Sequence, residues 1–245
     1  MLQEMFAAIE ANVSLTDLDV GAKARGTFHS AYDFDGFVIP GSVASANDTG
    51  TVEWVDNLAS TVRTLHSQQR PMLGLCFGHQ IISHALGGQV EKNAAHGMQA
   101  ASCSFELTSV GAQILEGGGS IASLQYHHND VVTRLPDCAV NLGGSAENPA
   151  HATAVYADAT VSRLIGALAS SEKPTAITFQ AHPEFSTPTG KRVMKALLED
   201  PEQTPPRSPE WLEERLATVD DPVTNTQALR MAWAATKTLW PAAFN

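Results

Sequence analysis

Positive charge is scarce in this sequence. It has 15 lysine and arginine residues against 26 aspartate and glutamate residues, a formal net charge of −11. A surface that acidic repels phosphate backbones and anionic lipid, which argues against nucleic acid and membrane surfaces as partners. The chain also lacks a run of about 18 apolar residues that could span a bilayer. The composition, with 43% hydrophobic and 17% charged residues, also excludes a chain that is disordered throughout.

Cysteine is equally rare. The 3 cysteines, Cys76, Cys103 and Cys138, are an odd number without C-x-x-C spacing, which argues against a disulfide framework and a zinc site. The first residues also lack the basic start and long apolar stretch of a secretory signal. We therefore expect a cytoplasmic protein with reduced thiols, with no metal and no other cofactor.

The first third of the chain alternates between helical and strand-like patterns. Apolar residues recur at helical spacing over residues 2–11, 53–67 and 81–86. Short apolar runs over residues 35–39 and 72–75 are typical of buried strands. This alternation predicts a parallel sheet with helices on its faces.

The middle of the chain is mostly strand-like, with glycine-rich turns. Strands are expected over residues 102–107, 121–126, 131–134, 161–169 and 176–180.

The end of the chain is predicted to be helical. We expect one α/β domain over residues 1–199, a proline-rich linker over 200–208 and a helical extension over 209–245. The expected helices span residues 189–198, 209–218 and 225–239.

Cys76 stands between a predicted strand and a predicted helix, in the segment Gly74-Leu-Cys-Phe-Gly78. A G-x-nucleophile-x-G turn needs its glycines because the backbone is cramped and turns sharply there. The N-terminus of the following helix favours a thiolate over a thiol. The backbone N–H of Phe77 would then be placed to bind an oxyanion. The alternative is that Cys76 is a small buried hydrophobic residue, as free cysteines usually are.

A cysteine nucleophile needs a base, and 9 histidines are candidates. His182 directly follows a strongly strand-like run, and catalytic groups of parallel α/β sheets gather at strand ends. Glu184, two residues on, could accept a hydrogen bond from the imidazole and fix its orientation.

These motifs together resemble the class I, triad-type glutamine amidotransferases, in particular the free-standing members similar to GMP synthase and to γ-glutamyl peptidases. Residues 74–80 resemble the family's nucleophile motif G-x-C-x-G-x-Q, and residues 181–185 resemble its H-P-E signature. Residues 35–42 are similar to the strand and turn that supply a second oxyanion donor, here Gly41, and residues 126–131 resemble a further stretch of these members. The resemblance covers about residues 5–199 and implies a three-layer, flavodoxin-like fold with a parallel sheet and helices on both faces. Together with the patterns above, we expect antiparallel strands in the middle of the chain and a C-terminal helical extension.

The resemblance also implies a chemistry. Cys76 would attack the γ-carboxamide of glutamine or of a γ-glutamyl compound and form a thioester, while His182, oriented by Glu184, moves the proton. The N–H groups of Gly41 and Phe77 would bind the oxyanion, and Gln80 would help to seat the glutamyl group. His127 is a candidate for the substrate pocket, the alternative being a histidine with a purely structural role.

Two departures and two further functions stay open. Family members normally begin with a β-strand, whereas this sequence opens within what resembles the first helix, and Pro40 stands where relatives often carry Thr or Ser. The sequence has no G-x-x-x-x-G-K-[ST] loop, so ATP-driven amination is not expected within it. The chain is expected to hydrolyse a small-molecule γ-glutamyl substrate, to serve as a glutaminase subunit that feeds ammonia to a separate synthase partner, or to be a catalytically idle relative.

Overall fold

A mixed sheet of seven strands is the centre of the computed structural model, which describes residues 1–18, 33–116, 119–157, 173–204 and 208–244. The strand order is β1-β2-β9-β8-β7-β4-β5. The parallel strands are β1 (Phe37–Ile39), β2 (Met72–Leu75) and β9 (Ala176–Phe179). The strands that continue the sheet in antiparallel pairing are β8 (Ala152–Val155), β7 (Ala139–Gly144), β4 (Gln99–Leu107) and β5 (Ile121–His128).

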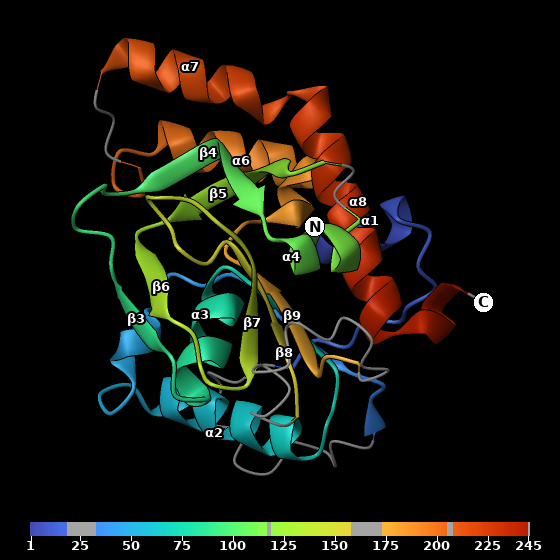
Figure 1. The fold of residues 1–245 in the computed structure, drawn as a ribbon. Helices are drawn as coiled ribbons and strands as arrows, with labels where there is room; N and C mark the ends of the chain where they lie inside the picture. The colour runs from blue at the N-terminus through green and yellow to red at the C-terminus, as the bar shows by residue number, and fades with distance from the viewer. Residues whose placement is uncertain (19–32, 117–118, 158–172, 205–207, 245) are drawn as a thin grey trace.

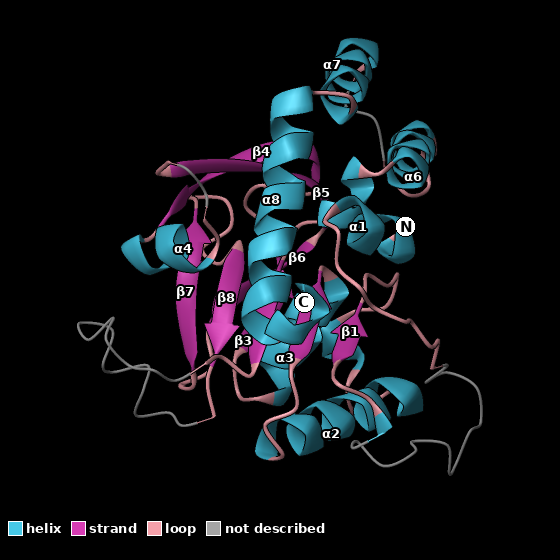
Figure 2. Ribbon diagram, turned by 90° about the vertical axis from the view of Figure 1, so that its right-hand side faces the viewer, coloured by secondary structure: helices cyan, strands magenta, loops and turns pink. Residues whose placement is uncertain are grey.

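Helices cover both faces of this sheet, so the fold has three layers (Figure 2). Met72 of β2 belongs to a core formed with α2 (Glu53–Ser67) and α3 (Phe77–Ala85). Its neighbour Leu73 belongs to the opposite core, with α1 (Leu2–Ala8), α4 (Ser109–Ile114) and α8 (Pro222–Leu239). This switch follows from the strand period of two, and it explains why β2 is apolar at every position.

The C-terminal helices differ in what they bury. Five residues of α8 join the same core as the sheet: Ala228, Met231, Ala232, Ala235 and Leu239. By contrast, α7 (Pro209–Val219) packs with α6 (Pro188–Glu199) against β4 in a smaller cluster, at the top of Figure 1. The helix α8 therefore covers one face of the sheet.

A separate two-stranded ribbon pairs β3 (Gln89–Lys92) with β6 (Asp130–Arg134) in antiparallel fashion. Its register places Lys92 directly opposite Asp130. Residues directly opposite each other in such a ribbon project their side chains from the same face. The ribbon therefore holds these two charged residues side by side.

Most predicted elements are present with shifted ends. The helix expected over residues 2–11 ends at Ala8, and the one expected over 81–86 begins earlier, at Phe77. The helix expected from residue 225 begins at Pro222, because Asp221 accepts hydrogen bonds from the N–H groups of Val223 and Thr224. The strand predicted over 161–169 lies outside the described residues, as do residues 205–207 of the predicted linker. Among the described residues, β1 forms one edge of the seven-stranded sheet.

None of the helices in the described ranges combines the length and the apolar composition that a membrane span requires.

Candidate active site

Cys76 occupies a strained turn between β2 and α3. Its φ of 52° and ψ of −101° are values that a residue with a side chain rarely adopts. Its N–H donates a hydrogen bond of 2.8 Å to the carbonyl oxygen of Phe179 at the end of β9. The strain is therefore held by the parallel strand next to β2.

Two glycines of the turn are required by close approach of the backbone. A Cβ atom at Gly78 would lie 1.9 Å from the carbonyl oxygen of Ile39 in β1, and one at Gly74 would lie 2.8 Å from the backbone of Gly78. Any larger residue at Gly78 would force β1 and α3 apart. The G-x-C-x-G spacing is thus a packing requirement of the strand–turn–helix unit.

His182 is fixed on several sides where the chain leaves β9. Its N–H donates to the carbonyl oxygen of Gln125 at 2.8 Å, and its ring stacks on Phe185 with 4.2 Å between ring centroids. Its Nδ1 lies 2.7 Å from Oε1 of Glu184, and both side chains are buried. A Cβ atom at Gly41 would lie only 2.7 Å from Cε1 of His182, so the backbone of that loop lies directly against the imidazole.

The electrostatics of His182 are dominated by two negative groups. Burial disfavours the imidazolium, but the negative charges of Cys76 and Glu184, and the hydrogen bonds to both, raise the pKa of His182 to about 10. The imidazole therefore carries a proton at neutral pH and forms a buried ion pair with Glu184.

A cavity of about 1210 Å³ opens above Cys76. Six of the seven site residues predicted from the sequence line it: Gly41, Cys76, Gln80, His127, His182 and Glu184. The seventh, Phe77, buries its side chain in the core beneath the turn, while its backbone N–H lies in the first turn of α3. The fold thus brings the predicted residues together. Among the described residues, no three His, Cys, Asp or Glu side chains are grouped as metal ligands.

His127 lines this cavity. Its Nε2 lies 2.7 Å from Oγ1 of Thr204, and its backbone oxygen lies 3.8 Å from Sγ of Cys76. Burial and the charge of His182 lower the pKa of His127 to about 4, so the ring is neutral at pH 7. This imidazole ties β5 to the segment that follows α6.

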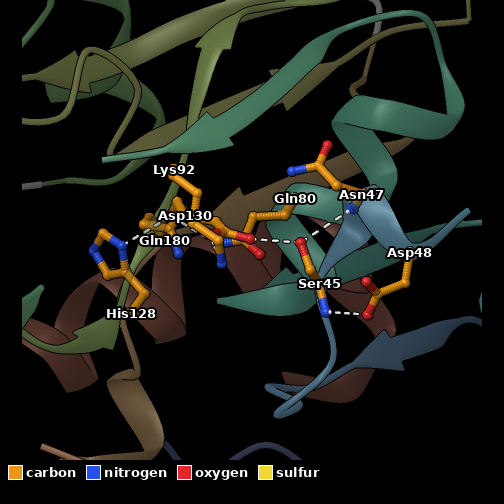
Figure 3. Close-up of polar contacts among 8 residues, drawn as sticks. All are labelled: Ser45, Asn47, Asp48, Gln80, Lys92, His128, Asp130 and Gln180. Carbon is orange, nitrogen blue, oxygen red and sulfur yellow. Dashed lines mark hydrogen bonds and ion pairs between the residues drawn. The ribbon is translucent and has the colours of Figure 1, made fainter. Parts of the chain in front are cut away.

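Gln80 belongs to a chain of polar contacts that begins at Cys76, and Figure 3 shows the part of this chain from Gln180 to Ser45. Nε2 of Gln180 lies 3.8 Å from Sγ of Cys76, and Oε1 of Gln180 accepts a hydrogen bond of 3.2 Å from Gln80. Gln80 also donates to the backbone oxygen of Asp130 at 2.9 Å. The carboxylate of Asp130 in turn accepts a hydrogen bond of 2.5 Å from Oγ of Ser45.

Comparison with known proteins decides the family. A family model described as glutamine amidotransferase class-I matches residues 1–200. The chain belongs to the class I glutamine amidotransferase family.

Two curated relatives of the chain illustrate this similarity. A glutamine amidotransferase-like protein from Schizosaccharomyces pombe is 30% identical over 67% of this chain and 58% of its own length. "Gamma-glutamyl peptidase 5" from Arabidopsis thaliana is 34% identical over 46% of this chain and 45% of its own length. The chain thus spans about half the length of the curated relatives it matches.

Solved structures support the fold of this chain. A glutamine amidotransferase from Thermotoga maritima superposes with a TM-score of 0.72 at 15% identity, covering 98% of this chain and 91% of the other. One from Methylobacillus flagellatus gives a TM-score of 0.69 at 20% identity, covering 97% and 89%. At these identities the likeness concerns the fold alone.

Four polar residues in the contact network around Cys76 were not singled out by sequence reasoning: Ser45, Lys92, Asp130 and Gln180. Ser45, Lys92 and Asp130 line the cavity. Two of the four lie next to or within a sequence motif that could have identified them. Gln180 directly precedes the segment that contains His182, and Asp130 lies within the stretch that resembles the family. Nothing in the sequence around Ser45 or Lys92 marks either as part of a site.

Proposed function

We propose that this chain is a thiol hydrolase that cleaves the γ-glutamyl amide bond of glutamine or of a γ-glutamyl compound, through a γ-glutamyl thioester on Cys76. The observation that carries the proposal is a cysteine held at positive φ in the floor of a cavity, with a buried imidazole–carboxylate pair facing it from the next strand. Membership of the class I glutamine amidotransferases supports the same chemistry.

The first half of the reaction uses the charge state of the site. Sγ of Cys76 attacks the amide carbon, and the N–H groups of Gly41 and Phe77 are proposed to stabilise the resulting oxyanion. The imidazolium of His182 then gives its proton to the leaving nitrogen, and the C–N bond breaks. A pKa of about 10 keeps this proton in place at neutral pH until the leaving group takes it.

The second half regenerates the thiolate and the imidazolium. His182, now neutral, removes a proton from water as the water attacks the thioester. Collapse of the second tetrahedral intermediate expels the Cys76 thiolate and releases the γ-carboxylic acid. The balance is one amide and one water consumed, with one carboxylic acid and one ammonia or amine produced. Glu184 stays charged throughout and orients His182.

The size of the cavity favours a substrate larger than glutamine. Small-molecule pockets commonly measure about 300–1,000 Å³, and this one measures about 1210 Å³. Its lining continues past His127 to Glu202 and Gln203, where the leaving group of a γ-glutamyl peptide or conjugate could extend. The relatives named γ-glutamyl peptidases agree with such a substrate.

One observation favours a second candidate, a glutaminase subunit that works on a separate synthase. Val43 lines the mouth of the cavity in the loop that carries Gly41, and 97% of it is exposed. An apolar side chain so exposed beside a catalytic loop is a contact that a partner could cover. Under this alternative, ammonia release by the purified chain is slow, and a synthase co-purifies with it.

The proposal is tested by mass spectrometry of the intact protein, quenched in acid after incubation with glutamine and a panel of γ-glutamyl peptides and conjugates. We expect a γ-glutamyl adduct on the peptide that contains Cys76, together with release of ammonia or amine. The Cys76→Ser variant should give neither, whereas Cys103→Ser, a matched change away from the cavity, should give both. Absence of an adduct and of any product with every compound in the panel would refute the proposal.

A further inference from the structure

Lys92 and Asp130 form an ion pair at the rim of the catalytic cavity, and the two partners differ in how firmly they are held. Nζ of Lys92 lies 2.7 Å from Oδ1 of Asp130, and the exposed fractions of the side chains are 68% and 8%. Both residues line the cavity that contains Cys76. A buried carboxylate is thus balanced by an exposed lysine ammonium.

Asp130 is fixed by its surroundings. Its Oδ2 accepts a hydrogen bond from Oγ of Ser45, which is itself locked as the N-cap of the turn Ala46–Asp48 (Figure 3). Its backbone oxygen faces Nε2 of Gln80 at 2.9 Å and Nδ1 of His128 at 3.0 Å. The carboxylate therefore has one position, while the long stem of Lys92 can reach a range of positions around it.

The polar chain described above connects this ion pair to the nucleophile. Gln80 bridges the backbone of Asp130 and Gln180, and Gln180 contacts Sγ of Cys76. A γ-glutamyl group has a matching layout, because its scissile carbonyl lies at one end and its α-ammonium and α-carboxylate lie together at the other. Cys76 and the ion pair line the same cavity, so a γ-glutamyl group with its carbonyl at Cys76 has this ion pair within the cavity as a charged partner for its other end.

We propose that Lys92 is a specificity-determining residue that binds the α-carboxylate of the γ-glutamyl group; this rests on the proposed function. Two opposite charges of the substrate meet two opposite charges of the protein. The α-ammonium replaces the Lys92 ammonium at the fixed carboxylate of Asp130. The displaced Lys92 ammonium, already within one hydrogen bond of that position, takes the adjacent α-carboxylate. The four groups then alternate in sign around the end of the cavity.

This arrangement also explains how the buried carboxylate of Asp130 is paired when no substrate is bound. Without substrate, the ammonium of Lys92 keeps the buried carboxylate of Asp130 paired, which avoids a buried, uncompensated charge. Substrate binding exchanges one ammonium for another at that carboxylate, so the exchange involves no loss of pairing. A ligand with an α-ammonium but no α-carboxylate would leave Lys92 displaced and without a partner.

The test compares substrates that differ only at the α-carboxylate. The probes are glutamine, γ-glutamylglycine and the analogue of each whose α-carboxylate is replaced by a carboxamide. The proteins are the wild type, Lys92→Met, which keeps an unbranched stem without charge, and Lys92→Arg, which keeps the charge. Lys195→Met is the matched control, because Lys195 forms a 2.5 Å ion pair with Asp220 away from the cavity. Amine and ammonia release give kcat and KM for each pair.

We express the preference for the free α-carboxylate as the ratio of kcat/KM for a substrate to kcat/KM for its carboxamide analogue. We expect the wild type to show such a preference. Lys92→Met should lower this ratio about ten- to hundredfold, because it removes a charge-assisted hydrogen bond. The change should lie in KM, since the contact exists in ground and transition states alike. Lys92→Arg should restore most of the preference, and Lys195→Met should keep it. If the wild type turns over the substrates but Lys92→Met has the same preference as wild type, the inference is wrong and the proposed function stands. If the wild type gives neither adduct nor product with any compound of the full γ-glutamyl panel, these four included, both are wrong.

Discussion

The hydrogen bond between Glu184 and His182 allows a prediction with a magnitude. Glu184→Gln keeps the length of the side chain and an oxygen that can accept from Nδ1 of His182, and removes only the negative charge. That charge acts at 2.7 Å between two buried side chains. A hydrogen bond to a charged group is worth about 1.5–3 kcal/mol, and about 1.36 kcal/mol corresponds to one pKa unit. The pKa of His182 should therefore fall by roughly one to two.

The sign of the effect on activity follows from the role of the proton. Leaving-group departure needs the imidazolium, so kcat/KM is lost as the pH rises through the pKa of His182, which is about 10 with Glu184 in place. Without the Glu184 charge the alkaline limb should move to lower pH by roughly one to two pH units. The variant should nevertheless retain turnover, since loss of an orienting carboxylate in serine-type triads costs on the order of a hundredfold less than loss of the nucleophile.

The assay is the pH profile of initial rates of ammonia or amine release on one substrate, from neutral to alkaline pH. The His182→Ala and Cys76→Ser variants serve as references for the loss of a chemical step, and circular dichroism checks that each variant is folded. An alkaline limb that stays where it is in wild type would show that Glu184 does not set the charge state of His182. A folded Glu184→Gln variant as inactive as Cys76→Ser would give Glu184 a direct role and refute our interpretation of the triad.

Three further predictions concern Cys76 and the turn that holds it. Cys76→Ser should abolish turnover, because an alkoxide is far scarcer than a thiolate at neutral pH, and it should leave the circular dichroism spectrum unchanged. Retained activity would contradict the assignment of Cys76 as the nucleophile. Cys76 should react with limiting iodoacetamide before the other cysteines in peptide mapping, because burial raises the pKa of Cys103 to about 11 and also raises that of Cys138; equal labelling would count against an activated thiol. Gly78→Ala should lower the Tm and the activity, since its Cβ would lie 1.9 Å from a carbonyl oxygen of β1, whereas Gly119→Ala, with nothing within 4 Å, should change neither; a Gly78→Ala protein as stable and active as wild type would disprove the steric argument.

The parts of the site that the sequence predicts are those encoded locally. The turn at Cys76 needs glycines at fixed offsets, because their Cβ atoms would meet neighbouring backbone. The pair of His182 and Glu184 lies within three residues of chain, at the end of a strand that is buried at every position. Such signals survive in a sequence read without an alignment.

The parts that the sequence does not predict depend on pairing between distant segments. Lys92 and Asp130 meet only because β3 pairs with β6 in one register, and a shift of one residue would turn one side chain to the other face. The sequence does not predict the strands β7 and β8, because glycine and alanine, which are frequent in both, have low strand propensity. They form because they close the sheet between β9 and β4.

The pKa of His182 distinguishes it from the other buried histidines of this chain. Several histidines lie in the same interior, and burial lowers the pKa of His79, His128 and His151 to about 3. These rings are neutral at pH 7 and engage hydroxyl or carbonyl groups, as His79 does with Thr178 at 2.7 Å. His182 is just as buried, but two negative groups face it, and they reverse the direction of the shift. Its neighbours, not its own burial, thus distinguish the proposed acid–base residue from the histidines that only support the sheet.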